Sequence, residues 1–233
     1  MRDLRENIVV SVDDFGIRNV ADAILPLAQQ GKLDRVSVLI NYMHSKDQAA
    51  ELSATGVKID LHLELIQLVK SGEKVQEGAL LRGGNFLVRY ISGNVRSSDV
   101  ERMWIDQIEC FKELFGRYPD GFNSHEHLHY FPKFFRIALS LGERYDVAFI
   151  RFSRKGVLRR GNAVISYVLA FLWKKDNRHY TSQKAPMDTT DFFISYDWID
   201  NLDDFLVQLP NGKMEMVFHP ERRHEYDVIE KYF

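Results

Sequence analysis

The segment NSHEHLHYFP, residues 123–132, places three histidines at alternate positions, with a glutamate between the first two. His125, Glu126 and His129 match the pattern H-E-x-x-H, in which a helix presents two histidines to zinc and the glutamate activates a water. On a strand, instead, His125, His127 and His129 would share one face, because strand side chains alternate between the two faces. The conformation of this segment therefore decides which chemistry the histidines can perform.

The neighbouring residues favour the strand. The sequence PDGFN directly before the histidines is typical of a turn, and Pro132 stands where the helix would have to continue. Leu128 is the only apolar residue within HEHLH, so a helix here would lack an apolar face. The extended zinc-protease pattern also requires a glycine at Pro132 and a histidine at Phe135. A version in which Glu143, on a later helix, is the third ligand stays open.

Further polar residues stand at the ends of predicted strands, and these ends lie together if the strands are parallel. Buried strands are predicted for NIVVSVDDFG, RVSVLIN, VKIDLHLEL, DVAFIRF, TTDFFIS and KMEMVFHPE. Asp13, Asp14, His62, Arg151 and His219 lie at or near the carboxyl ends of these strands. Parallel β/α folds build their sites at this edge, and mixed Asp and His ligands suit a divalent metal. Each residue alone has an ordinary structural explanation, whereas the combination predicts a functional cluster.

Helices are predicted between the strands, which makes the fold class α/β, with a mainly parallel sheet and a barrel-like closure. They are Asn19 to Gln30, SKDQAAELSATG, SSDVERMWIDQIECFKELFG with Gly116 after its end, a helix from about Phe131 with Pro132 in its first turn, and NLDDFLVQL. Residues 71–94 are predicted to form a long loop with a short helix. The segment 153–185 is basic and only partly periodic, so its structure is the hardest to predict from the sequence. Its apolar run, 163–173, is too short to span a bilayer and is predicted to be a helix.

The composition is that of a folded protein, with 45% hydrophobic and 27% charged residues among 233, and predicts a single domain over residues 1–233. A net charge of −2 gives no reason to expect a nucleic-acid partner. The single cysteine, Cys110, excludes an intramolecular disulfide and suggests a reducing compartment. The charged start MRDLREN lacks the apolar stretch of a signal peptide, so we expect a cytoplasmic location without membrane insertion. The sequence leaves open whether the chain forms a homodimer.

Five segments, VSVDDFG, IDLHLEL, NSHEHLHYFP, IRF and FHPE, occur in an order that resembles the YdjC-like carbohydrate deacetylases, a family that includes chitooligosaccharide deacetylases. The resemblance runs from Ile8 to about Pro220, and the DDFG and SHxHxH elements together are specific to it. It implies a deformed (β/α) barrel related to the polysaccharide-deacetylase fold, with one divalent ion, Mg²⁺ or Zn²⁺. The implied ligands are Asp14, His62 and His125.

The chain departs from the usual family pattern next to these ligands. It has SVDDFG where NADDFG is common, DLHLELI where GxHxxLT is common, and Glu126 where a histidine is common. These differences leave every implied ligand in place and bear on sugar specificity and metal identity.

The resemblance implies a metal-dependent hydrolase that removes acetyl groups from N-acetylated sugars or oligosaccharides. The ion would lower the pKa of a water and polarise the amide carbonyl, and Asp13 would take the proton as general base. Both acids reach one cavity only if the chain turns at Phe15 and Gly16. His219 is the candidate acid for the leaving amine. Arg151 either holds Asp13 by a charged hydrogen bond or forms a surface ion pair.

Two alternatives stay open for each of the other histidines and nearby aromatic residues. His127 and His129 either orient a ligand imidazole or contact a sugar hydroxyl. Four aromatic residues either stack on sugar rings or belong to the core: Phe15, Tyr130, Phe131 and Trp198. Other functions for the whole chain are a metal-dependent phosphoesterase on the same kind of barrel and a non-catalytic sugar-binding member of the family.

Overall fold

The structure of the chain is a computed structural model, and it describes residues 4–17, 20–43, 45–65, 90, 95–159, 163–182 and 187–233. The loop predicted over residues 71–94 lies outside this part of the chain, apart from Tyr90.

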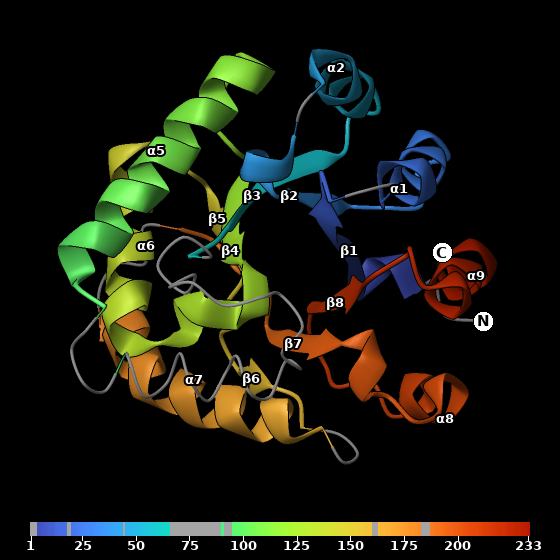
Figure 1. Cartoon of the computed structure of the whole chain (residues 1–233). Helices are drawn as coiled ribbons and strands as arrows, with labels where there is room; N and C mark the ends of the chain where they lie inside the picture. Colours follow the sequence, from blue (N-terminus) through green and yellow to red (C-terminus); the bar gives the residue numbers. More distant parts are fainter. Residues whose placement is uncertain are drawn as a thin grey trace, which may run out of the picture.

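Eight parallel strands form one sheet in the described part of the chain (Figure 1). They are β1 (Ile8–Phe15), β2 (Arg35–Val38), β3 (Lys58–Leu63), β4 (Gly121–Ser124), β5 (Phe149–Ile150), β6 (Gly156–Val157), β7 (Phe192–Ser195) and β8 (Met214–Phe218). Their order across the sheet is β5-β4-β3-β2-β1-β8-β7-β6, so β1 and β8 are neighbours at its centre. The predicted α/β class with a parallel sheet is confirmed.

The helices lie around the outside of the curled sheet (Figure 1). They are α1 (Val20–Gln29), α2 (Lys46–Ala54), α5 (Ser97–Phe115), α6 (Pro132–Arg144), α7 (Val164–Ser182), α8 (Leu202–Val207) and α9 (Arg223–Tyr232). Short 3₁₀ turns are η1 (Leu4–Glu6), η2 (Ile40–Tyr42), η3 (His125–Tyr130) and η4 (Tyr196–Trp198). Gly116 ends α5 in a left-handed conformation, with φ of 69°, and Pro132 opens α6, as predicted.

The strands are buried on both faces, because the helices cover the outside of the barrel and side chains fill its inside. Val10 and Val12 on one face of β1, and Ser11 on the other, have no exposed surface, and in the neighbouring β8 Met216 and Val217 are at most 1% exposed. Strands covered on both sides appear in the sequence as continuous apolar runs. This is why the apolar runs predict most of the strands.

The curled sheet closes through a segment before β7, residues 188–190, which we call the closure segment. Phe149 of β5 forms an isolated parallel bridge with Asp188. The N–H of Ile150 donates to the carbonyl of Asp188 at 2.9 Å, and the N–H of Asp188 donates to the carbonyl of Ala148 at 2.7 Å. Among the described residues β5 and β6 are not neighbours in the sheet, so the barrel is deformed at this position.

One prediction of local structure is wrong. The histidine segment is neither a strand nor an α-helix, because β4 ends at Ser124 and η3 follows. Within η3, Glu126 and His127 have left-handed backbones, with φ of 54° and 55°. The helix predicted for the apolar run 163–173 is confirmed as the first part of the 19-residue helix α7, and β6, which was not predicted, precedes it. Each helix in the described part of the chain is too short or too polar to cross a bilayer.

Candidate metal site and the adjoining acid–arginine network

An irregularity in β1 brings two neighbouring acids to the same end of the barrel. The register of β1 against β2 shifts between Val12 and Phe15, which is the pattern of a β-bulge. Asp14, within this bulge, has a left-handed backbone with φ of 66°. Gly16 follows with φ of 112°, and a side chain there would meet the carbonyl oxygen of Leu39 at 2.9 Å. The turn required by the sequence is therefore formed by the bulge together with Gly16.

Asp14, His62 and His125 come from β1, β3 and the end of β4, and their side chains meet. Oδ1 of Asp14 lies 3.5 Å from Nε2 of His62 and 3.3 Å from Nδ1 of His125. The two imidazole rings lie edge to face, with 5.6 Å between their centroids. One potential ligand atom from each residue falls within 4.8 Å of the others, a spacing that a single metal ion can bridge.

This set of donor atoms fits a divalent cation. Oδ1 of Asp14 is buried and has no hydrogen-bond partner among the described residues, and such an oxygen costs free energy unless a donor or a cation satisfies it. Burial acts to raise the pKa of Asp14, but the imidazoles of His125 and His62 outweigh it and the pKa is lowered. The carboxylate therefore stays ionised. One carboxylate with two imidazoles suits Zn²⁺ and does not exclude harder divalent ions.

A chain of hydrogen bonds fixes the ring of His62. Its Nδ1–H donates to Oδ1 of Asn123, and Nδ2 of Asn123 donates to Oγ of Ser37 at 2.7 Å. Nη2 of Arg151 donates to the same oxygen of Ser37 at 3.3 Å. Because Nδ1 of His62 carries the proton, Nε2 keeps its lone pair toward Asp14. Burial lowers the pKa of His62, which favours the neutral imidazole that a metal requires.

Asp13 is held by a buried arginine. Nη1 and Nη2 of Arg151 donate to Oδ2 and Oδ1 of Asp13 at 2.6 and 2.8 Å, and Nε donates to Oε1 of Glu215 at 2.8 Å. Arg151 has no exposed side-chain surface, so the alternative of a surface ion pair is wrong. Burial acts to raise the pKa of Asp13, but the charge of Arg151 outweighs it and holds the pKa well below its usual value.

The three histidines of HEHLH face different environments, because the left-handed residues Glu126 and His127 turn the chain within η3. His125 belongs to the three-residue cluster, whereas Glu126 is exposed. The zinc-protease arrangement, which requires one α-helix through His125 and His129, is therefore not formed. The predicted strand face shared by the three rings is also not formed.

His129 has a structural position. Its Nε2 donates to the carbonyl of Arg151 at 2.6 Å, and its Nδ1 accepts from Oγ of Ser124 at 2.7 Å. Burial lowers the pKa of His129 to about 3, so the ring is neutral. Since both ring nitrogens are used, the contact with a sugar hydroxyl expected as one alternative for His129 is not available. His129 instead ties η3 to the end of β5.

His127 lies among aromatic side chains. Its ring packs edge-on against Phe193 and Trp198, at centroid distances of 5.4 and 6.2 Å, and its buried Nδ1 has no hydrogen-bond partner among the described residues. Contact of His127 with a substrate stays a prediction. For Phe15 and Tyr130 the core alternative is correct, because neither has any exposed surface with which to stack on a sugar.

His219 follows β8 at the same edge of the barrel. Its backbone N–H donates to Oε2 of Glu225 at 2.7 Å, and its Nδ1 lies 3.9 Å from that oxygen. The His219 side chain is 20% exposed, and its charge contributes to lowering the pKa of Asp13. His219 is thus within electrostatic range of Asp13 and accessible to solvent, and its role as an acid stays a prediction.

Comparison with known proteins bears on what this arrangement does. The family model described as YdjC-like protein matches residues 7–231. The chain belongs to the YdjC-like family.

Several curated relatives of this YdjC-like chain carry deacetylase names. A chitooligosaccharide deacetylase from Escherichia fergusonii is 28% identical over 158 residues, which cover 64% of the chain and 60% of that protein. A carbohydrate deacetylase from Danio rerio is 26% identical, with 70% of the chain and 55% of that protein covered. One from Homo sapiens is 29% identical, with 63% and 48% covered. The chain thus matches about half to three fifths of the length of these relatives.

A solved structure shares the fold of the YdjC-like chain. It is a protein from Enterococcus faecalis V583, provisionally named for cellobiose-phosphate cleavage, with a TM-score of 0.56 and 16% sequence identity. The alignment covers 91% of the chain and 79% of the other protein. At this identity the similarity establishes the fold alone.

Sequence reasoning missed three polar residues that complete the site of the YdjC-like chain. Ser37, Asn123 and Glu215 are fully buried and lie within strands. A signal for Glu215 existed, because an acid inside the apolar run MEMVF can be buried only with a cationic partner. Ser37 and Asn123 gave no comparable signal, since short polar residues are common at strand ends.

Proposed function

We propose that this YdjC-like chain is a metal-dependent hydrolase that removes acetyl groups from N-acetylated sugars or oligosaccharides. The observation that carries the proposal is the carboxylate of Asp13, held by two hydrogen bonds from Arg151 next to a cluster suited to one metal ion. The names of the curated relatives support the same reaction. The single domain over residues 1–233 and the cytoplasmic location stay predictions.

Asp14, His62 and His125 would hold one divalent ion, Mg²⁺ or Zn²⁺. When bound, such an ion supplies a lowered pKa for a water and polarisation of the amide carbonyl. The carboxylates of Asp13 and Asp14 would repel each other if both stood alone. The charge of Arg151 on one side and of the ion on the other offsets this repulsion.

Asp13 serves as the general base. Each of its oxygens accepts one hydrogen bond from Arg151 and keeps a second lone pair for the attacking water. The low pKa keeps Asp13 ionised before the substrate arrives, and the two-point contact fixes the direction of the carboxylate. As the water oxygen adds to the carbonyl carbon, its proton moves to Asp13. As the C–N bond breaks, the amine leaves with a proton from His219, and acetate and the amino sugar are the products.

Acetate release tests the proposal. The purified chain is incubated with N-acetylglucosamine and its oligomers after treatment with a chelator, and Mg²⁺, Zn²⁺, Mn²⁺ or Co²⁺ is then added. Acetate is expected only after metal addition. Asp13→Asn should abolish release, whereas Glu126→Gln, at an exposed position on the same turn as His125, should leave it largely intact. An active Asp13→Asn together with an inactive Glu126→Gln would refute the proposal.

Two other functions are distinguished by further measurements. A phosphoesterase of this kind usually gathers two or more ions, whereas the described residues contain one three-residue cluster. Two or more tightly held ions by elemental analysis, with phosphate release and no acetate release, would favour the phosphoesterase. Saturable binding of the oligomers with no turnover under any metal would favour a sugar-binding protein.

A further inference from the structure

Helix α7 has an exposed apolar face. Its residues Val164, Ile165, Tyr167, Val168 and Phe171 are between 43% and 67% exposed. With 3.6 residues per turn these positions fall on one side of the helix. The described part of the chain exposes one other large apolar side chain, Val207 on α8. Five of six such side chains therefore form one continuous patch, which is typical of a surface that has a partner.

The opposite side of α7 already packs against the barrel. Leu169, Leu172 and Tyr180 are buried in the core, and Nε1 of Trp173 donates to the carbonyl of Ser153 at 2.9 Å. The exposed apolar face is therefore distinct from the side of α7 that packs on the core. It is a second apolar face on a helix that is already docked.

Cations border this face. Arg159, Lys174 and Lys175 are exposed. The guanidinium of Arg159 lies 5.7 Å from the ring centre of Tyr167, and the ammonium of Lys175 lies 4.7 Å from that of Phe171. Cationic side chains therefore lie directly beside apolar ones on this surface.

The charge of this region differs from that of the whole chain. Residues 153–185 contain eight lysines and arginines and one acid, Asp176, which is buried, whereas the chain as a whole has a net charge of −2. Arg154 and Lys155, before α7, pair with Asp188 and Asp191, whereas Arg159, Lys174 and Lys175 border the exposed face. The exposed face of α7 therefore matches a partner that is both apolar and anionic. An interfacial helix on an anionic lipid surface has this combination of apolar and cationic groups.

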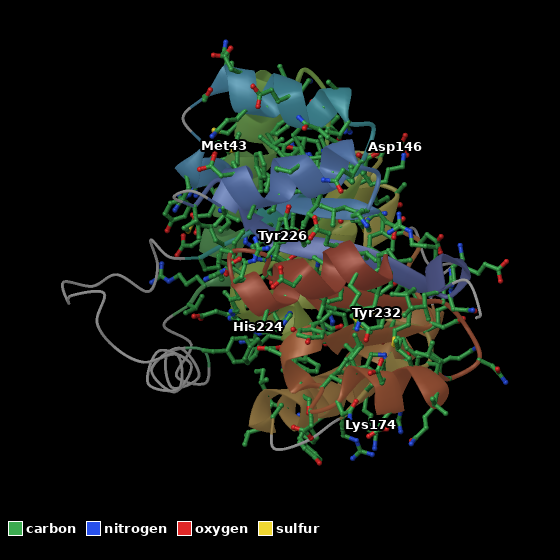
Figure 2. The ribbon with its side chains drawn as sticks, turned by 90° about the vertical axis from the view of Figure 1, so that its right-hand side faces the viewer. Met43, Asp146, Lys174, His224, Tyr226 and Tyr232 are labelled. Carbon is green, nitrogen blue, oxygen red and sulfur yellow. The ribbon has the colours of Figure 1, made fainter. Side chains whose placement is uncertain are left out.

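The position of α7 agrees with such a partner. Because α7 follows the carboxyl end of β6, its apolar first half begins at the edge of the barrel that carries the metal-ligand cluster. It also contacts η3, the turn that holds His125. In Figure 2 the carboxyl ends of the strands lie toward the left, where Met43, after β2, and His224, after β8, are labelled. Asp146, just before β5, lies at the right, and Lys174 of α7 lies at the lower margin.

We propose that α7 docks the chain on an anionic lipid surface, with the Val164–Phe171 face in the apolar boundary and Arg159, Lys174 and Lys175 at the phosphate groups. A second copy is a poorer partner, because a symmetric contact would bring the same cations together and the face carries no exposed acid among its described residues. Docking adds a surface to the proposed hydrolase and does not depend on its activity.

Sedimentation with vesicles tests the docking. The full chain should bind vesicles of phosphatidylcholine mixed with phosphatidylglycerol, bind phosphatidylcholine alone far more weakly, and be released by salt. Phe171→Glu should lower the partition coefficient at least about tenfold, and so should the pair Lys174→Glu and Lys175→Glu. Val207→Glu, at the exposed apolar residue outside the face, is the matched control and should bind as the unaltered chain does.

Thermal melting separates docking from folding, and the paired lysine variant changes exposed residues only. Two results would overturn the proposal. One is equal binding of all variants, or no binding to anionic vesicles. The other is a dimer in analytical ultracentrifugation that Phe171→Glu dissociates while vesicle binding is absent, which would assign the face to a second copy. Because no step uses acetate release, these results stand whether or not the chain is a deacetylase.

Discussion

Asp13 and Asp14 are consecutive residues of β1, yet their carboxylates have opposite surroundings. Asp13 accepts two hydrogen bonds from a guanidinium that has no exposed surface. Asp14 presents a buried oxygen to two imidazoles, and that oxygen forms no hydrogen bond within the described part of the chain. The bulge in β1 allows this difference, because neighbours in a regular strand point to opposite faces of the sheet.

The difference separates two tasks. The chain itself supplies the partners of Asp13, so their contacts contribute to folding and to the orientation of the proposed base. The partners of Asp14 are incomplete without a cation, so its contribution depends on metal binding. Substitutions of the two acids should therefore change different quantities.

Asp13→Asn has the largest expected effect. Acetate release should fall by about 10²–10⁴, the usual contribution of a general base. Arg151 would keep Glu215 as its one charged contact in the network, so the free energy of unfolding should fall by up to about 3–5 kcal/mol. Measurement of kcat/KM and urea denaturation give the two quantities. A variant as stable and as active as the unaltered chain would contradict both roles.

Asp14→Asn should give the reverse pattern. Asparagine tolerates the left-handed backbone at this position, so the fold is kept. Loss of the anionic ligand should lower the affinity for Zn²⁺ at least about 100-fold. The free energy of unfolding of the metal-free protein should change by less than about 1 kcal/mol. Calorimetric titration and denaturation in chelator measure both, and unaltered affinity would exclude Asp14 as a ligand.

Asn123→Ala tests whether the ring of His62 needs its fixed orientation. Without the acceptor for Nδ1–H, metal affinity should fall by about 10–100-fold. Asn41→Ala is the matched control, because Asn41 bonds to Glu64 instead, at 2.6 Å. Equal affinity in the two variants would show that the hydrogen-bond chain does not act on the metal site.

Asp176 extends the comparison to a buried acid that forms no ion pair within the described part of the chain. Oδ2 of Asp176 has no hydrogen-bond partner among the described residues, and burial raises its pKa to about 7, although Arg136 and Lys175 act against this. The folded state therefore holds a proton that the unfolded state has released between about pH 4 and 7, so stability falls as pH rises through this range. At pH 8, Asp176→Asn should be more stable by about 1–2 kcal/mol. Thermal melts across pH check this, and the gain should vanish below about pH 4.

Much of the fold was predictable because the barrel buries whole strands. Apolar runs marked most of the strands, and Gly116 and Pro132 marked an end of α5 and the start of α6. The prediction failed where local signals were missing. Glu126 and His127 adopt left-handed backbones without a glycine in the segment, so nothing in the sequence announced the turn in η3. Helix α7 was only partly predicted, because its apolar residues cover both of its faces.

For the candidate site, the sequence indicated the residues better than their partners. Asp14, His62 and His125 were named together through the family resemblance, and the structure brings them together. The contact between Asp13 and Arg151 was one of two alternatives, and sequence could not decide because burial of Arg151 depends on Glu215, which lies 64 residues away. Contacts of this kind are set by the barrel as a whole rather than by any local pattern.

The closure segment affects how the barrel moves. An isolated bridge at residue 188 and single hydrogen bonds to Thr189 and Thr190 join the ends of the sheet in place of a full ladder, and elements held by few hydrogen bonds open at a lower free energy. Amide hydrogens of Ile150 and Asp188 should therefore exchange with solvent faster than those of β1 and β8. Because Arg151 directly follows β5, an opening that also moves the end of β5 would shift the guanidinium relative to Asp13. The fraction of time for which the proposed base is correctly oriented would then depend on how often the barrel opens at the closure segment.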